Sequence, residues 1–274
     1  MFDLFRKDKP PETAPEPKPE APAEEEMPWR KPKGRVAEVG WMIHGDKNRF
    51  IYEAPKAVYK KPEPGTPAKA VGYCPAVLDN EARHFEVKCP FDLHLRYTIG
   101  PNGKPAMVNV AGKQSAVSAH MIDQIVKMEP VDNWRSFERP VLQIGAPWRF
   151  VADEPVYLVQ LPPFNHHRDP ALPGTMITAR FPIHIWPRSL MWAFEWHDTS
   201  KDLILKRGEP WFYLRFEIFD PARAVRLVEA EMTPELKEYC AGLEGVVNFV
   251  KQSFDLFKVA EERRPKVLLK KVER

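Results

Sequence analysis

The feature that most constrains the fold is an alternation of apolar and polar side chains, residue by residue, in several stretches between residues 36 and 219. The stretch PWFYLRFEIF covers residues 210–219. Its even-numbered positions from Phe212 to Ile218 are all apolar and share one face, whereas Arg215 falls on the other face. Successive side chains of a β-strand point to opposite faces, so this pattern indicates extended backbone with one buried face. We therefore expect a mainly β fold.

The densest β pattern lies in residues 141–219, where Pro and Gly separate short apolar runs. The runs read PVLQI, PWRFV, PVYLVQL, GTMITARFPIHIW, SLMWAFEWH, DLILK and PWFYLRFEIF. Several short strands spaced roughly ten residues apart favour an antiparallel β-sandwich or a jelly roll. Shorter β-type runs occur upstream in RVAEVGWMIHG, NRFIYEAPKAVY and HFEVKCPFDLHLRYTIG, with the Pro-rich loop KKPEPGTPAKAVG between the last two. The pair Asn102-Gly103 tolerates positive φ and predicts a hairpin turn.

Composition shifts divide the chain into four parts. Eight of the 30 prolines fall in residues 1–34, mixed with Glu and Lys, so we expect a disordered arm there. Residues 35–230 form the predicted β-rich domain, and residues 231–264 form one long amphipathic helix. The residues 265–274, PKVLLKKVER, end the chain as a basic tail.

The predicted helix has a clear start and a long apolar stripe. Thr233 supplies a capping hydroxyl and Pro234 occupies the first turn. Apolar residues then recur at steps of three and four, at Leu236, Tyr239, Cys240, Leu243, Val247, Val250, Phe254 and Phe257. We expect this stripe to dock on the sheet or on a partner chain.

Bulk composition indicates a soluble globular protein, with 43% hydrophobic and 29% charged residues. A net charge of +3, with both signs spread along the chain, does not produce the basic field that nucleic-acid binding needs. No apolar run approaches the ~18–20 residues that span a bilayer, and the N-terminus is too charged for a signal peptide. The cysteines Cys74, Cys89 and Cys240 lack a disulfide pattern, which favours a reducing compartment. We therefore expect a cytoplasmic protein without a membrane or nucleic-acid partner.

Residues 146–219 carry a family resemblance. The specific part is Gly208-Glu209-Pro210 followed by Trp211 and Phe212, after the Trp-rich strand SLMWAFEWH. This segment resembles a functionally uncharacterised family of bacterial and phage proteins, a domain of unknown function. The chain departs from the family at LPPFNHH, where the family has a Gly-Pro-Asn turn. The resemblance implies a β-rich fold and no known activity, and it makes a phage-associated, virion location an alternative to the cytoplasm.

The stretch FNHHRDP raises the question of a metal site. His167 and Asp169 have the H-x-D spacing of a non-haem Fe(II) triad, and His184 or His197 would supply the third ligand. However, the stretch follows LPPF and precedes a proline, which is typical of a loop. We favour a turn in which Asn165 and Asp169 bind backbone amides, with Fe(II) as the alternative.

A zinc site is a further possibility, because the chain offers two thiols and two imidazoles close in sequence: Cys74, His84, Cys89 and His94. Structural zinc sites use tight knuckles such as C-x2-C, whereas these four residues are separated by ten, five and five positions. We therefore favour four unconnected residues.

Tryptophans at Trp192, Trp196 and Trp211 either form a ligand-binding platform or belong to the core. Their alternation in SLMWAFEWH favours the core. Glu195 and His197 occupy the opposite face, as an acid–base pair in a cleft or, as we favour, as a solvated edge.

Glu209 lies between Gly208 and Pro210 and cannot change register. We expect its carboxylate to accept hydrogen bonds from the backbone of its turn and so to fix the turn's conformation; contact with a ligand is the alternative.

The leading hypothesis from the sequence is a non-enzymatic interaction or assembly protein. Its arm, with the apolar tip MFDLF, and its C-terminal helix would contact a protein partner or a second copy of the chain. One alternative is a jelly-roll, non-haem Fe(II)-dependent oxygenase. The other is a carbohydrate- or peptide-binding β-sandwich that uses the tryptophans.

Overall fold

The computed structural model describes residues 34–45, 50–67, 69–247 and 253–273, and the predicted arm thus lies almost wholly outside the described residues. The fold is mainly β, with 36% strand against 20% helix, so the predicted class is confirmed at this level. None of the helices in the described part of the chain combines the length and the apolar character needed to cross a membrane.

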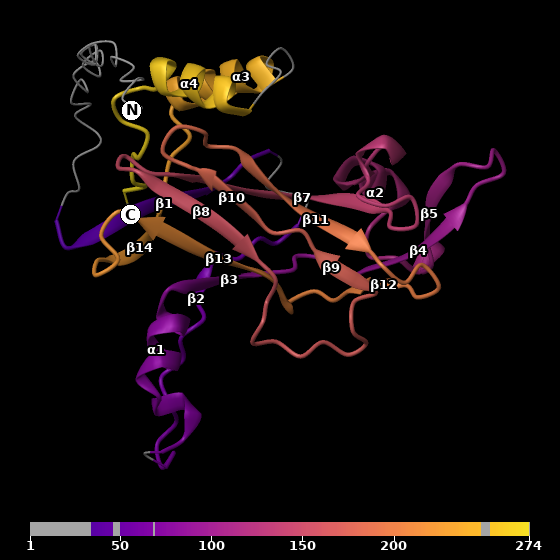
Figure 1. The fold of residues 1–274 in the computed structure, drawn as a ribbon, viewed down its shortest axis with the longest axis horizontal. Helices are drawn as coiled ribbons and strands as arrows, with labels where there is room; N and C mark the ends of the chain where they lie inside the picture. The colour runs from indigo at the N-terminus through magenta and orange to yellow at the C-terminus, as the bar shows by residue number, and fades with distance from the viewer. Residues whose placement is uncertain (1–33, 46–49, 68, 248–252, 274) are drawn as a thin grey trace, which may run out of the picture.

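Three sheets make up the body of the molecule (Figure 1). The first has the order β14–β1–β7–β11–β9, with β6 also paired to β7; the second has the order β10–β8–β13–β3–β2; and the third has the order β12–β4–β5. The strands of the first sheet are β1 (Val36–Ile43), β6 (Val126–Met128), β7 (Val141–Val151), β9 (Gly174–Met176), β11 (Ser189–Trp196) and β14 (Ala224–Glu229). Those of the second are β2 (Lys56–Ala57), β3 (His84–Lys88), β8 (Val156–Leu161), β10 (Ala179–Pro182) and β13 (Pro210–Ile218), and those of the third are β4 (Leu93–Ile99), β5 (Pro105–Asn109) and β12 (Leu203–Leu205).

The main core lies between side chains of the first two sheets. Phe150 of β7 and Phe216 of β13 have ring centroids 5.5 Å apart, and Trp192 of β11 and Trp211 of β13 have theirs 6.1 Å apart. All four rings are nearly or fully buried. The period of two in the sequence therefore marks the faces that these sheets turn toward each other.

Strand boundaries differ from the sequence prediction in several places. The runs PVLQI and PWRFV form one continuous strand, β7. The run GTMITARFPIHIW divides into β9 and β10, which belong to different sheets. The run NRFIYEAPKAVY contributes only the short β2, and neither β6 nor β14 was predicted.

Among the described strand pairs all are antiparallel except β1 with β14, so the prediction of an antiparallel fold was wrong for that pair.

The chain contains four α-helices in its described part: α1 (Pro75–Ala82), α2 (Ala119–Ile125), α3 (Pro234–Val247) and α4 (Ser253–Arg263). Short 3-10 turns accompany them, η2 (Val71–Tyr73), η3 (Gly112–Gln114) and η4 (Val131–Asn133). In Figure 1, α3 and α4 lie side by side on one side of the sheets, and α1 extends away from the sheets on the other.

A single long C-terminal helix is not confirmed, because α3 and α4 pack against each other. The hydroxyl of Tyr239 in α3 lies 2.7 Å from the carbonyl oxygen of Ala260 in α4, across 21 residues. One straight helix would separate these residues by about 30 Å. The predicted helix start is confirmed, since the Thr233 hydroxyl accepts from the backbone N–H of Leu236.

The apolar stripe of this region contacts the chain itself. Leu236, Tyr239, Cys240 and Leu243 are buried in a second core, together with Val151 of β7 and neighbouring residues. The described part of the stripe is thus covered by the same chain, through the first sheet, the segment after β10, α4 and the C-terminal tail.

The C-terminal tail is also docked, although we expected only a basic extension. Leu268 is 1% exposed, and the carboxylate of Asp153 accepts from the backbone N–H groups of Leu268 and Leu269 at 2.7 and 3.2 Å. Gly40 of β1 leaves the space for this tail, because a Cβ added there would lie 2.4 Å from Leu269 Cδ1. Leu268 and Leu269 are therefore part of the packed structure.

Candidate functional site

The stretch FNHHRDP lies in the loop between β8 and β9, so its prediction as a loop is confirmed. His167 and Asp169 are both exposed there. The hydrogen bond of Asn165 differs from the prediction, because its amide donates to the Glu81 carboxylate at 3.3 Å rather than bonding the loop's own backbone.

The alternative Fe(II) ligands do not come together. Buried His184 has Nδ1 within 3.2 Å of the backbone of Val156, whereas the ring of His197 contacts Thr175. In the described part of the chain, no group of three or more His, Cys, Asp or Glu side chains could hold a metal ion. The proposed set of His167, Asp169 and a third histidine therefore has no cluster to support it.

Arg168, the residue between the two proposed iron ligands, holds the loop in place. Its Nη2 donates to the Pro210 carbonyl at 2.7 Å, and its Nη1 lies 3.1 Å from the Glu209 carboxylate. Glu209 follows Gly208, which has φ +83. The carboxylate therefore fixes a neighbouring loop through an ion pair, which corrects the prediction that it binds the backbone of its own turn.

The four residues considered for zinc each have a separate environment. Cys74 is exposed, whereas buried Cys89 donates its thiol to the Phe91 carbonyl at 3.2 Å, and burial raises the pKa of that thiol to about 12. Buried His84 donates from Nδ1 to the Asn80 carbonyl at 2.6 Å, and burial lowers its pKa.

His94 belongs to an ion-paired cluster that sequence reasoning missed. Its Nε2 lies 2.7 Å from Asp202, and Arg96 donates two hydrogen bonds of 2.8 Å to the same carboxylate. The hydrogen bonds from Arg96 and then from His94 lower the pKa of Asp202 to about 2. The cluster joins β4 to the start of β12 and gives each charged group a partner.

The tryptophans of the proposed platform belong to the core. Trp192, Trp196 and Trp211 are each at most 1% exposed. The core interpretation is therefore confirmed, and a ligand platform at these three positions was wrong, because their ring faces contact other side chains rather than solvent.

Glu195 and His197 do lie near each other, with 3.8 Å between Oε1 and Nε2. Glu195 is 4% exposed, so the prediction of a solvated edge is wrong for this carboxylate. Arg135 and Arg139 lie in the segment before β7, and their Nη1 atoms are 3.6 and 3.7 Å from the carboxylate oxygens of Glu195. The buried charge is thereby surrounded by cationic groups, which is the arrangement that a carboxylate needs when it leaves water.

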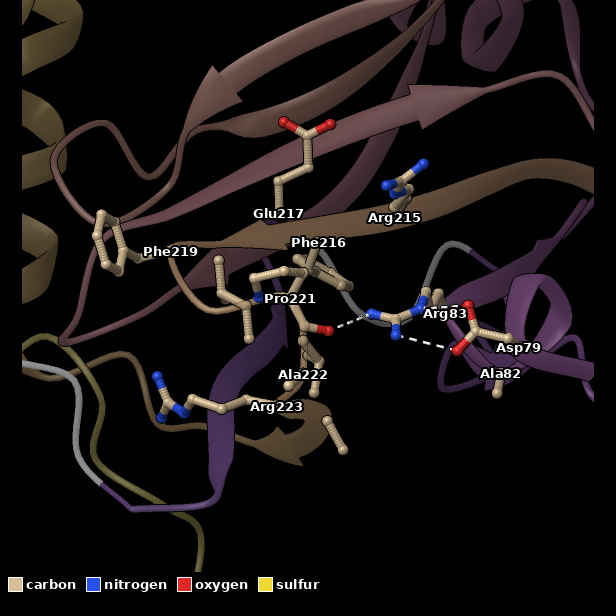
Figure 2. A pocket seen from close by; sticks show the side chains of 13 residues that line it. Asp79, Ala82, Arg83, Arg215, Phe216, Glu217, Phe219, Pro221, Ala222 and Arg223 are labelled. Atoms are coloured by element: carbon tan, nitrogen blue, oxygen red, sulfur yellow. Dashed lines mark hydrogen bonds and ion pairs between the residues drawn. The ribbon is translucent and has the colours of Figure 1, made fainter. Parts of the chain in front are cut away.

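A pocket of about 570 Å³ lies where the chain passes from β13 to β14, beside the base of α1 (Figure 2). Phe216 and Ile218 contribute apolar surface, and Phe219 at the rim is 90% exposed. Arg83 spans the gap between the elements, because it pairs with Asp79 of α1 and donates to the Pro221 carbonyl at 2.8 Å.

The chemistry of this pocket suits binding. Asp79 pairs with Arg83, and Glu217 pairs with Arg180 at 2.7 Å, so both carboxylates that line it are already ion-paired. The hydrogen bond from Arg83 lowers the pKa of Asp79, which keeps this carboxylate charged rather than ready to accept a proton. Arg83 and Arg223 are ion-paired as well, so what remains available is apolar surface together with the guanidinium of Arg215.

The segment that leads to this pocket projects from the body of the molecule. We use the name projecting segment for residues 56–83, which start at β2 on the edge of the second sheet and continue outward through η2 and α1 (Figure 1). None of its described residues is buried, and Val71 and Tyr73 are 73% and 40% exposed. Cys74, which follows them, carries the exposed thiol among the three cysteines.

Sequence reasoning missed α1, although a signal was present. The segment KKPEPGTPAKAVG was assigned to a Pro-rich loop, and the helix that follows it was not predicted. Pro75 occupies the first turn, and Asp79 and Arg83 stand four residues apart, which are both marks of a helix.

Comparison with known proteins leaves the geometry as the basis for a functional proposal. No protein-family model matches the chain, and no curated protein or solved structure is similar to it. The resemblance of residues 146–219 to a phage and bacterial family therefore stays a prediction.

Proposed function

We propose that this protein is a non-enzymatic interaction protein and that the projecting segment is the element that binds its partner. The observation that carries the proposal is that none of the described residues of this segment is fully buried in its own chain. Ordering the backbone costs about 1–2 kcal/mol per residue, and an isolated helix as short as α1 is marginal in water. Contacts with a partner would supply the missing stabilisation.

The body of the molecule acts as a rigid support for this element. We propose a β-sandwich architecture for it, and the ring contacts between β7 or β11 and β13 support that assignment. Arg83 and the Asn165–Glu81 hydrogen bond attach the base of α1 to the body. The base is thus fixed while the tip stays free to engage a partner.

The partner contact that we expected at the C-terminal helix moves to the projecting segment. Leu236, Tyr239, Cys240 and Leu243 are already buried in a core of their own chain. By contrast, Val71 is 73% exposed. Exposed apolar side chains gathered on a projection are the more plausible source of binding free energy.

A photo-crosslinking amino acid placed at Tyr73 tests the proposal. Position Phe137, which is 78% exposed, serves as the matched control. We expect irradiation of the full chain in its native extract to give a discrete adduct from position 73 that the substitution Val71→Asp abolishes. The proposal fails when position 73 gives no adduct, or when both positions give the same distribution of adducts.

A further inference from the structure

The pocket beside the base of α1 contains one guanidinium without a counterion among the described residues. Arg83, Arg215 and Arg223 all line this pocket (Figure 2). Both carboxylate oxygens of Asp79 accept from Arg83, and both of Glu154 accept from Arg223. Arg215 is exposed, and in the described part of the chain no residue forms a hydrogen bond or an ion pair with its side chain. Its charge is therefore available to a ligand.

Arg215 is close enough to act on the other charged groups of the pocket. The pKa of Asp79 is lowered mainly by the hydrogen bond from Arg83, and the positive charge of Arg215 lowers it further. Figure 2 shows Arg215 beside Arg83, on the α1 side of the pocket, and Phe219 on the opposite side. An anionic group that enters from solvent thus meets Arg215 as the cation that it can pair with.

Much of the remaining lining is apolar. Phe219 is 90% exposed, Ile218 and Val225 are half-buried, and the turn between the two strands adds Pro221 and Ala222. The volume of about 570 Å³ lies within the range of roughly 300–1,000 Å³ that is common for small-molecule sites. An apolar chain that covered these side chains would remove their surface from water, which favours binding in proportion to the area covered.

We propose that this pocket binds a small carboxylate that carries an apolar chain, with the carboxylate on Arg215 and the chain against Phe219. The planar guanidinium group suits a carboxylate because it can donate two parallel hydrogen bonds to the two oxygens. This ligand site goes beyond the proposed function, because it does not require the projecting segment to bind a partner.

The acidic groups around the pocket favour a ligand with a single negative charge. Asp79 and Glu217 line the pocket, and Asp220 lies in the adjoining turn, where its carboxylate accepts from the backbone N–H of Ala222 at 2.9 Å. The guanidinium of Arg215 can neutralise one carboxylate. The second charge of a phosphate monoester would instead lie among these acidic groups without a partner.

Isothermal titration calorimetry of the full chain tests the proposal with four probes. Octanoate has the charge and the chain, octanol lacks the charge, and acetate lacks the chain. Octyl phosphate is doubly charged at about pH 8, because the second pKa of a phosphate monoester is near 6. We expect octanoate to bind with a dissociation constant of about 1 mM or lower, and at least about fivefold more tightly than each of the other probes.

Two pairs of variants locate the site. Arg215→Gln should remove the preference for octanoate over octanol, whereas Arg207→Gln, which changes an exposed arginine outside the pocket, should keep it. Phe219→Ala should weaken the binding of octanoate and octanol alike, by about threefold or more, because apolar contact area is lost. Phe137→Ala is its matched control, since Phe137 is 78% exposed elsewhere on the surface. Far-ultraviolet circular dichroism checks that each variant is folded.

Four results would overturn the proposal. They are no saturable binding of octanoate, equal affinities for octanoate and octanol, an Arg215→Gln chain that keeps the preference for octanoate, and tighter binding of octyl phosphate than of octanoate. None of them changes the photo-adduct expected from position Tyr73. The ligand site and the proposed function can therefore fail independently of each other.

Discussion

Replacing Arg264 with methionine should destabilise the fold strongly. The Arg264 side chain is 0% exposed, and its guanidinium donates to the carbonyl oxygens of His184 at 2.6 Å and of Ala152 and Asp153 at 3.2 Å each. These bonds connect the end of α4 to the turn after β7 and to the segment after β10. Methionine fills a similar space but donates nothing.

The expected magnitude follows from opposing effects. Each carbonyl that loses a charged donor costs about 1–3 kcal/mol, whereas removing a desolvated cation returns part of that free energy. Burial lowers the pKa of Arg264, which shows that its charged form is desolvated in the fold. We expect a net loss of about 3 kcal/mol in the free energy of unfolding.

Urea unfolding followed by tryptophan fluorescence measures this loss. With a slope of about 2–3 kcal/mol per molar urea, the midpoint should fall by about 1 M at an unchanged slope. The neighbouring Arg263 is exposed, so Arg263→Met is the matched control and should change stability by no more than about 0.5 kcal/mol. The reasoning is refuted when the two variants unfold at the same urea concentration.

Three further predictions concern the body of the molecule. Gly40→Ala should destabilise the fold by about 1–3 kcal/mol in the same urea assay because its Cβ would overlap the docked tail, whereas Gly145→Ala, whose Cβ meets a neighbour only at 3.7 Å, should not do so by this mechanism. Carboxyl titration by NMR should place the pKa of Asp202 near 2, and the pKa should rise in the variant Arg96→Gln. Because the pKa is depressed in the folded state, the ion pairs stabilise the fold above the unfolded pKa of about 3.9, and this stabilisation is lost as the pH falls toward 2. An unshifted pKa of Asp202 would contradict the cluster. Glu209→Gln should speed hydrogen exchange in the loop that contains FNHHRDP, since the ion pair at 3.1 Å is lost, and equal exchange in both proteins would show that the loop is held by other contacts.

The alternation of side chains predicted most of the strands because it reports burial, and burial is local to a strand. The residues Phe212, Leu214 and Phe216 face the core as the sequence predicted. The same signal cannot show which sheet a strand joins, so the division of GTMITARFPIHIW between β9 and β10 was not predictable from it. Strand β14 was missed because its pairing with β1 is a contact between distant parts of the chain.

The candidate site was harder to predict than the fold. Periodicity placed Trp192 and Trp196 correctly in the core. It could not show that Arg135 and Arg139, more than fifty residues away, would reach Glu195. The pocket likewise needs α1 to lie against the turn after β13, and that arrangement depends on the hydrogen bond from Arg83 to Pro221 rather than on any local pattern.

The accessibility of Cys74 tests the central claim, that the projecting segment binds a partner protein, most directly. Cys89 and Cys240 are buried, so the native chain offers one exposed thiol at the proposed interface without any substitution. The account predicts that a maleimide modifies Cys74 rapidly in the purified chain and at least tenfold more slowly when the chain is held in its native extract with its partner. An equal modification rate in the two preparations would contradict it.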